Sequence, residues 1–217
     1  MLLVAYRRGI FPMAVDKRGR IGWFSPDPRA VIPLDHRFHI PHGLRRVWRQ
    51  CVVQEKLEGE PSGEPRVGPH GRGSAGASPS KPKFEITSDT DFETVIRECA
   101  RRKEGTWISP GIIDSYCRLH RLGHAHSIET RLDGKLVGGL YGVALGGAFF
   151  GESMFHRVTD ASKVALVALV ERLRAGGFVL LDTQWAAPHL RQFGAYEIPR
   201  QEYLWRLEQA LKLDRRF

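Results

Sequence analysis

Cysteines and long apolar runs are scarce in this chain of 217 residues, and each shortage excludes a class of protein. The three cysteines, Cys51, Cys99 and Cys117, are odd in number and far apart, with no CxxC pair, so neither a disulfide framework nor a thiolate zinc site is indicated. No apolar stretch reaches the roughly 18 residues of a membrane span. The opening "MLLVAYRRGIFP" lacks the long apolar core and cleavage site of a signal peptide. We therefore expect a soluble protein of the reducing cytoplasm, with no membrane partner.

Motifs for metals, nucleotides and nucleophilic serines are also missing. "LHRLGHAH" supplies His120, His124 and His126, but no HExxH occurs and no fourth ligand is evident, so we expect no metal. "LVGGLYGVALGG" is rich in glycine, yet no GKS or GKT follows, which argues against a bound nucleotide. Ser153 and Ser162 lack the GxSxG frame of a hydrolase nucleophile. No cofactor is predicted.

Positive charge is abundant, with a formal net charge of +9 and an isoelectric point near 9.8. Such a balance favours a polyanionic partner, most commonly nucleic acid, although a basic surface kept for solubility explains it equally well. "IPHGLRRVWRQ" predicts a short helix on which Arg45, Arg46 and Arg49 share one face. This face suits a phosphate backbone, and a solvated helix surface is the alternative.

Gly, Pro and Ser crowd out apolar residues in one segment, residues 58–83, which we interpret as a flexible insertion. It separates a short N-terminal region, residues 1–57, from a longer region, residues 84–217, and neither contains an internal repeat. In the longer region we expect a strand and helix with Ser88 or Asp89 as cap, a second helix stopped by Gly123, a three-stranded antiparallel meander, a third helix, the strand "FVLLDTQW" and a final helix pair. This order predicts an α+β fold with a mostly antiparallel sheet.

Two polar features stand beside apolar strands. In "FVLLDTQW", strand alternation places Asp182 and Gln184 on one face and Thr183 on the other. In "GESMF", Glu152 follows an apolar strand, where its carboxylate could meet a cationic substrate; a capping or ion-paired glutamate is the alternative.

A collinear series of segments resembles the bacterial leucyl/phenylalanyl-tRNA–protein transferases and covers nearly the whole chain outside the insertion. The segments are "AYRRGIFP", "WFSPDPRAVIPL", "EGTWIS", "LGHAHSIE", "LVGGLYGVALG", "FFGESMF", "ASKVAL", "LLDTQ" and "HLRQFGAYEIPR". The resemblance implies an enzyme that moves Leu or Phe, and sometimes Met, from aminoacyl-tRNA to an N-terminal Arg or Lys of a protein, marking that protein for N-degron degradation. It also implies a small N-terminal domain joined to a domain like the GCN5-related acyltransferases, used without coenzyme A.

The same resemblance assigns roles to individual residues. It makes Asp182 and Gln184 the catalytic pair, with the Gln184 carbonyl accepting a hydrogen bond from the attacking amine and Asp182 orienting it. Glu152 is implied to recognise the basic acceptor residue, and Trp107 to stack on the terminal adenine. The implied aminoacyl pocket consists of Leu140, Phe149 and Leu181, and the implied tRNA contacts include Arg46 and Arg49, beside which Arg45 lies.

Some residues depart from the family pattern. Met13 follows "GIFP" where an aromatic often completes the adenine sandwich, and His42 and Ala187 replace more polar or basic residues. A "GGDL"-type segment does not precede "AYRRGIFP", so we expect either a start codon assigned too far downstream or a truncated N-terminal domain. Two rival functions remain, a coenzyme A-dependent N-acetyltransferase and a non-catalytic RNA-binding protein. We expect a monomer.

Overall fold

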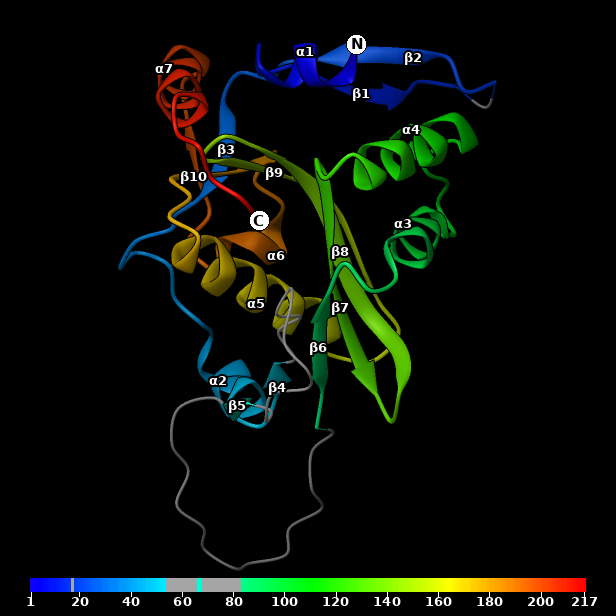
Figure 1. The fold of residues 1–217 in the computed structure, drawn as a ribbon, viewed down its shortest axis with the longest axis vertical. Helices are drawn as coiled ribbons and strands as arrows, with labels where there is room; N and C mark the ends of the chain where they lie inside the picture. The colour runs from blue at the N-terminus through cyan, green and yellow to red at the C-terminus, as the bar shows by residue number, and fades with distance from the viewer. Residues whose placement is uncertain (17, 54–65, 68–82) are drawn as a thin grey trace, which may run out of the picture.

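The computed structural model describes residues 1–16, 18–53, 66–67 and 83–217 (Figure 1). Most of the predicted insertion, 58–83, therefore lies outside the described residues. In the portion that is described, no helix has both the length and the apolar character needed to cross a membrane.

A nine-stranded sheet forms the centre of the molecule. Its strands lie in the order β11 (Tyr196–Ile198), β3 (Arg29–Ile32), β10 (Leu180–Gln184), β9 (Ala148–His156), β8 (Lys135–Leu145), β7 (Ala125–Leu132), β6 (Glu85–Ser88), β4 (Val52–Val53) and β5 (Arg66–Val67). Two neighbouring pairs, β9–β10 and β4–β6, are parallel, and the other described pairs are antiparallel. The predicted α+β fold with a mostly antiparallel sheet is confirmed.

The predicted meander is β7, β8 and β9. Asp133 and Gly134 join the first two strands with φ of 50° and 72°, the left-handed values that a tight two-residue hairpin turn requires. Gly146 turns the chain again at φ of 56°. A side chain there would meet the Ala210 carbonyl at 2.8 Å, so this turn also needs glycine for close approach to the last helix.

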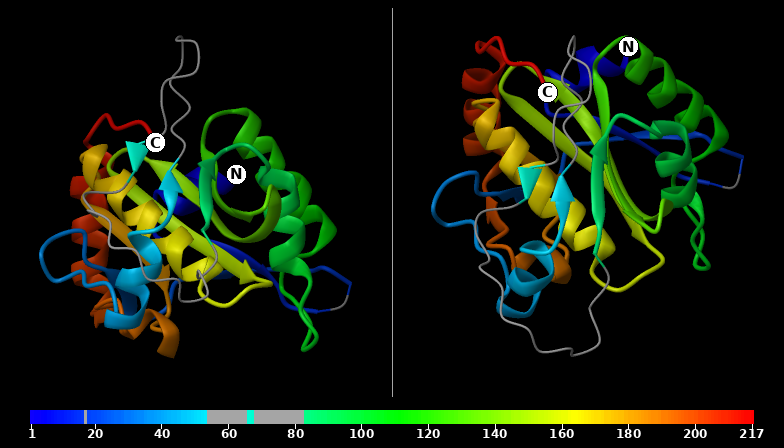
Figure 2. Two further views of the ribbon diagram at one scale, coloured as in Figure 1. Left: turned by 90° about the horizontal axis from the view of Figure 1, so that it is seen from below. Right: turned by 60° about the horizontal axis from the view of Figure 1, so that its bottom comes forward.

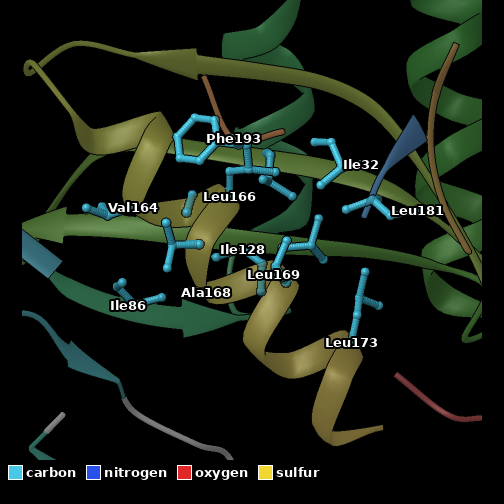
Figure 3. Packing of buried hydrophobic residues seen from close by; sticks show 14 of the residues in the cluster. Ile32, Ile86, Ile128, Val164, Leu166, Ala168, Leu169, Leu173, Leu181 and Phe193 are labelled. Carbon is cyan, nitrogen blue, oxygen red and sulfur yellow. The ribbon is translucent and has the colours of Figure 1, made fainter. Parts of the chain in front are cut away.

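One face of the sheet is covered by α5 (Ala161–Ala175), the predicted third helix. Its sequence "ASKVALVALVERLRA" is apolar nearly all round, because it is enclosed by the sheet on one side and by α2 (His42–Trp48) on the other. Figure 3 shows Val164, Leu166, Leu169 and Leu173 of α5 among side chains from the strands. Each such side chain, when fully buried, contributes roughly 1.5–3 kcal/mol of transfer free energy.

The opposite face carries α3 (Phe92–Ala100) and α4 (Pro110–Arg121), and Figure 2 shows these two helices across the sheet from α5. The second core cluster on this side also includes residues of α1 (Leu2–Tyr6), β1 (Phe11–Ala14) and α7 (Arg200–Leu211). β1 pairs with β2 (Ile21–Phe24) in a separate small sheet, and α6 (Pro188–Arg191) follows β10. The N-terminal elements thus lie over one end of the large sheet (Figure 1).

Helix α3 does not begin where the sequence indicated. Its N-cap is Asp91, not Ser88 or Asp89, and no side-chain hydrogen bond caps it. Asp89 has a φ of 57° and turns its carboxylate to the Ser127 backbone N–H at 2.8 Å and to His126 Nδ1 at 2.7 Å. Asp89, which local sequence rules would use as the helix cap, therefore makes contacts with a neighbouring strand instead.

Strands β3 and β4 both come from the predicted N-terminal region, residues 1–57, and lie in the large sheet beside strands of the longer region. β3 bridges β10 and β11, and β4 extends β6. The N-terminal region therefore shares the large sheet with the residues that follow the insertion.

Candidate active site

A cavity of about 280 Å³ opens where two parallel strands separate. β9 and β10 are paired from Ala148 and Leu180 to Phe150 and Asp182, and no further. Beyond the last pair, β9 continues beside β8 while β10 continues beside β3. The cavity is lined by residues from both strands around this point, Gly151, Glu152, Ser153 and Met154 on one and Leu181, Thr183 and Gln184 on the other. The separation of the strands thus makes room for a ligand within the sheet.

A β-bulge positions Glu152. Tyr141 of β8 opposes Ser153, but its neighbour Gly142 opposes Gly151, so Glu152 is the extra residue on β9. Bulges of this kind redirect a side chain and are common beside active sites. Here the carboxylate turns toward two tyrosines, with Oε1 accepting from the Tyr6 hydroxyl at 2.6 Å and Oε2 from the Tyr116 hydroxyl at 3.1 Å.

Burial raises the pKa of Glu152 to about 7, because a charged carboxylate is poorly solvated there. The hydrogen bonds from Tyr6 and Tyr116 act in the opposite direction, while the charge of Asp182 raises the pKa further and that of Arg29 lowers it. Within the described residues of the chain, no ion pair joins Glu152 to a cation. Among the described residues, the charge of Glu152 is therefore not offset by a direct ion pair.

Asp182 lies in a different setting, fully buried behind the cavity. Arg29 from β3 donates Nε to Oδ1 at 2.8 Å and Nη2 to Oδ2 at 2.6 Å, a bidentate ion pair. The Tyr203 hydroxyl donates to Oδ2 at 2.8 Å, and the Gln184 backbone N–H donates to Oδ1 at 2.9 Å. The carboxylate is thus saturated by contacts within the chain.

The predicted alternation along β10 ends at Gln184. The pairing with β3 shifts between Asp182 and Gln184, and Gln184 has a φ of 58°. As a result Thr183 and Gln184 both line the cavity, whereas Asp182 holds Gln184 through its backbone N–H. The prediction that Asp182 and Gln184 share one face, with Thr183 on the other, was wrong for Gln184, because the bulge adds a residue to one strand and breaks the period of two.

Three buried polar groups around the cavity have no hydrogen-bond partner among the described residues. They are the hydroxyls of Tyr141 and Thr183 and the side-chain amide nitrogen of Gln184. Buried polar groups are normally paired, since leaving one unpaired costs roughly 1–3 kcal/mol. They are therefore the groups of the cavity that a ligand or water could pair with.

Much of the apolar lining comes from β8, β10 and α5. Leu140 and Leu181, predicted for an aminoacyl pocket, both line the cavity, together with Leu166 and Leu169 of α5. Figure 3 shows Leu166, Leu169 and Leu181 in one cluster. Phe149 does not line the cavity; it is fully buried in the core, with its ring 5.3 Å from that of Phe217.

Trp107 and Met13, which were predicted to contact the terminal adenine, also line the cavity. The Ala14 backbone N–H donates to the Trp107 carbonyl at 3.1 Å, which ties β1 to the loop before α4. Phe11 adds a third apolar side chain, and Trp185 stands edge-on to its ring at 5.2 Å.

The predicted basic face is on α2, where Arg45, Arg46 and Arg49 are exposed at the end of the helix or just beyond it. Leu44 and Val47 anchor the helix in the core cluster that also contains α5 residues. None of the three arginines lines the cavity, so any role in binding RNA is exercised on the outer surface.

Several residues of the site were missed by sequence reasoning. Tyr6, Tyr116 and Tyr203 are separated from their carboxylate partners by many residues, and no local pattern predicts such contacts. Arg29 offered one signal, because a cation at the start of the apolar run "RAVI" needs a partner if the strand is buried.

The cavity has the features of an enzyme site: it is mainly apolar, with a few convergent polar groups and a carboxyl of shifted pKa. Residues 74–208 match the family model described as leucyl/phenylalanyl-tRNA protein transferase, and residues 1–27 match the model of the N-terminal domain of the same family. The chain therefore belongs to the leucyl/phenylalanyl-tRNA–protein transferase family, and the predicted class of enzyme, an aminoacyltransferase, is confirmed.

Relatives with this name are similar over their whole length. The protein of Gloeobacter violaceus is 51% identical over 217 residues, covering 100% of this chain and 95% of the relative. That of Akkermansia muciniphila is 48% identical over 214 residues, covering 98% and 95%.

Solved structures are less similar. Aminoglycoside acetyltransferase AAC(6')-Iy matches with a TM-score of 0.35 and 15% identity, over 60% of this chain and 90% of that one. L-PGS from Bacillus licheniformis matches with a TM-score of 0.40 and 13% identity, over 87% and 54%.

Proposed function

We propose that this protein transfers Leu or Phe, with Met as a further donor, from aminoacyl-tRNA to the N-terminal Arg or Lys of an acceptor protein. The observation that carries the proposal is the composition of one cavity. It joins an apolar wall to a carboxylate that makes no ion pair with any described residue, and Gln184 and the cation Arg102 lie in the same lining. An apolar aminoacyl group and a basic acceptor residue can therefore be held side by side.

The donor end fits the apolar wall. Leu140 and Leu181 would enclose the Leu or Phe side chain, with Leu166 and Leu169 behind them. Trp107 and Met13 would hold the terminal adenine between them, a ring on one side and a thioether on the other. Phe149 would act from the core, by supporting this wall.

The acceptor end fits Glu152. A guanidinium or ammonium group entering the cavity would supply the positive charge that Glu152 lacks, and it would lower the pKa of the carboxyl below its present value of about 7. Tyr6 and Tyr116 each donate to one carboxylate oxygen, so the carboxylate cannot rotate freely. The remaining lone pairs of both oxygens stay available to the substrate cation.

The reaction requires little help from the protein in moving a proton. The neutral α-amino nitrogen of the acceptor attacks the ester carbonyl carbon, a C–N bond forms, and the C–O bond to the ribose of the terminal adenosine breaks. The ribose oxygen leaves as a hydroxyl with a proton that the amine has lost. An α-amino group has a pKa of roughly 8, so a useful fraction is already neutral at pH 7.

Gln184 would accept a hydrogen bond from the attacking amine through its side-chain carbonyl, and Asp182 would position Gln184 through the backbone N–H at 2.9 Å. An amide is too weak a base to remove a proton at this pH. Orientation of the two substrates is therefore the main contribution of these residues to the rate. Arg29 and Tyr203 support this arrangement by holding Asp182.

The exposed arginines of α2, Arg45, Arg46 and Arg49, would contact the phosphate backbone of the tRNA body. Residues 84–217 would act as a domain like the GCN5-related acyltransferases without coenzyme A, and residues 1–57 as an N-terminal domain. The protein would work as a monomer in the cytoplasm and mark acceptors for N-degron degradation.

Transfer of labelled phenylalanine from Phe-tRNA tests the proposal. A peptide beginning with Arg is compared with one beginning with Ala, and labelled acetyl-CoA is supplied in a parallel reaction. We expect label on the Arg peptide alone. Equal labelling of both peptides would remove Glu152 from acceptor selection, and acetylation in place of aminoacylation would overturn the function.

A further inference from the structure

Tyr141 is buried in the wall of the cavity with a hydroxyl that no group of the described chain satisfies. Its ring is held firmly, edge-on to Tyr116 at 5.5 Å and to Phe92 at 5.8 Å. The ring packing explains the aromatic side chain. It does not explain the hydroxyl, because a phenylalanine would pack in the same way without a buried polar group.

The hydroxyl lies on the side of the cavity that holds Glu152. Tyr141 opposes Ser153 across the bulge that contains Glu152, and its ring contacts Tyr116, which donates to the Glu152 carboxylate. Burial raises the pKa of Tyr141, the neighbouring Tyr116 and Glu152 raise it further, and the charge of Arg102, which also lines the cavity, lowers it. Glu152 and the Tyr141 hydroxyl thus offer separate hydrogen-bond acceptors to one ligand.

We propose that the Tyr141 hydroxyl accepts a hydrogen bond from the guanidinium of the acceptor's N-terminal arginine and sets the preference for Arg over Lys. The proposal rests on the proposed function and deepens it at the acceptor end. A guanidinium presents five N–H groups in a rigid plane and can reach two separate acceptors at once, whereas an ammonium is a compact point charge. Glu152 would select for positive charge, and Tyr141 would distinguish the two cations.

The test is Tyr141→Phe, which removes one oxygen and keeps the ring. We expect the KM for an Arg peptide to rise roughly 10-fold, the KM for a Lys peptide to change less than about 3-fold, and kcat to stay within about 2-fold for both. The matched control is Tyr196→Phe, which removes a hydroxyl that accepts from Arg206 at 2.7 Å, outside the cavity lining. It should leave all of these constants unchanged.

A second measurement uses the unaltered protein, so it does not depend on how the variant folds. An acceptor peptide whose N-terminal arginine is methylated on its guanidinium keeps its charge but loses an N–H, and its KM should rise toward that of the Lys peptide. In the Tyr141→Phe variant, methylation should have a much smaller effect. The KM increases caused by the Tyr141→Phe substitution and by methylation of the peptide should therefore be less than additive.

Equal KM increases for Arg and Lys peptides, a loss confined to kcat, or no change at all would each overturn the assignment of Tyr141. Absence of transfer to any basic peptide by the unaltered protein would instead overturn the proposed function. The two failures are therefore distinguishable.

Discussion

Two carboxylates lie close to the same cavity, and they differ in what surrounds them. Asp182 is matched by the bidentate guanidinium of Arg29 and by the Tyr203 hydroxyl, all within the chain. Glu152 receives two tyrosine hydroxyls and no cation from the described residues, and its pKa rises to about 7. The first carboxylate belongs to the architecture of the site. The second is left incomplete, as expected of a group that binds a charged substrate.

Arg29→Met should have the largest effect, on the free energy of unfolding. It would leave Asp182, like Glu152, without a cationic partner among the described residues. Asp182 would remain fully buried without a cation, and removal of one partner from a buried ion pair costs about 3–5 kcal/mol. We expect a loss of this size in the free energy of unfolding measured in urea. Arg37→Met, which breaks the exposed ion pair with Asp35, is the control and should cost less than about 1 kcal/mol. Similar losses in the two variants would mean that Asp182 does not depend on its buried partner.

Glu152→Gln tests the second carboxylate by removing its charge while keeping its shape. The kcat/KM for an Arg peptide should fall about 100-fold, because the substrate cation loses its counter-charge. Glu197→Gln, on the surface beside Arg191, should have little effect on transfer. An equal loss of kcat/KM in both variants, or no loss in Glu152→Gln, would contradict the role of Glu152 in binding the acceptor.

The stability of the same variant should respond to pH in a definite direction. The folded pKa of Glu152 is raised from 4.5 to about 7, so its contribution to stability is present below pH 4.5 and is lost as pH rises through 7. The loss amounts to roughly 3 kcal/mol. Urea unfolding at pH 5 and pH 8 should therefore show a smaller decline for Glu152→Gln than for the unaltered protein, and parallel declines would refute the shifted pKa.

Gln184→Ala probes the cavity residue whose backbone N–H donates to Asp182. Single-turnover transfer should slow roughly 10- to 100-fold, since orientation of the amine is lost, while the melting temperature changes little. Gln201→Ala on the exposed surface of α7 is the control. If the single-turnover rate is unchanged, Gln184 plays no role in the chemical step.

Met13→Trp should give the smallest effect, a change in the affinity for aminoacyl-tRNA. Met13, like Glu152, lines the cavity. A second aromatic opposite Trp107 should tighten the binding of aminoacyl-tRNA about 3-fold, because a base stacked between two rings gains contact area. Binding is measured by fluorescence anisotropy, with Met154→Leu as a volume-conserving control in the same lining. Weaker binding would show that Met13 does not contact the adenine.

Much of the fold follows from local patterns. The helices α4 and α5, the turn at Asp133 and Gly134, and the meander were all predicted from periodicity and turn residues. The capping of α3 was not, because Asp89 makes a contact with His126 and Ser127 that depends on β7 lying beside it. The participation of β3 in the large sheet was also missed, since its partners β10 and β11 lie near the other end of the chain.

The amino-acid pattern alone was enough to predict the family, the mostly antiparallel α+β fold and five residues that line one cavity, Glu152, Gln184, Trp107, Leu140 and Leu181. Motifs and periodicities are local, so they are readable from one chain. Only the tertiary structure decided that β9 and β10 separate, that bulges redirect Glu152 and Gln184, and that Arg29 neutralises Asp182 while Glu152 is left without a cation among the described residues. These features depend on strand register and on burial, which arise when distant segments pack together.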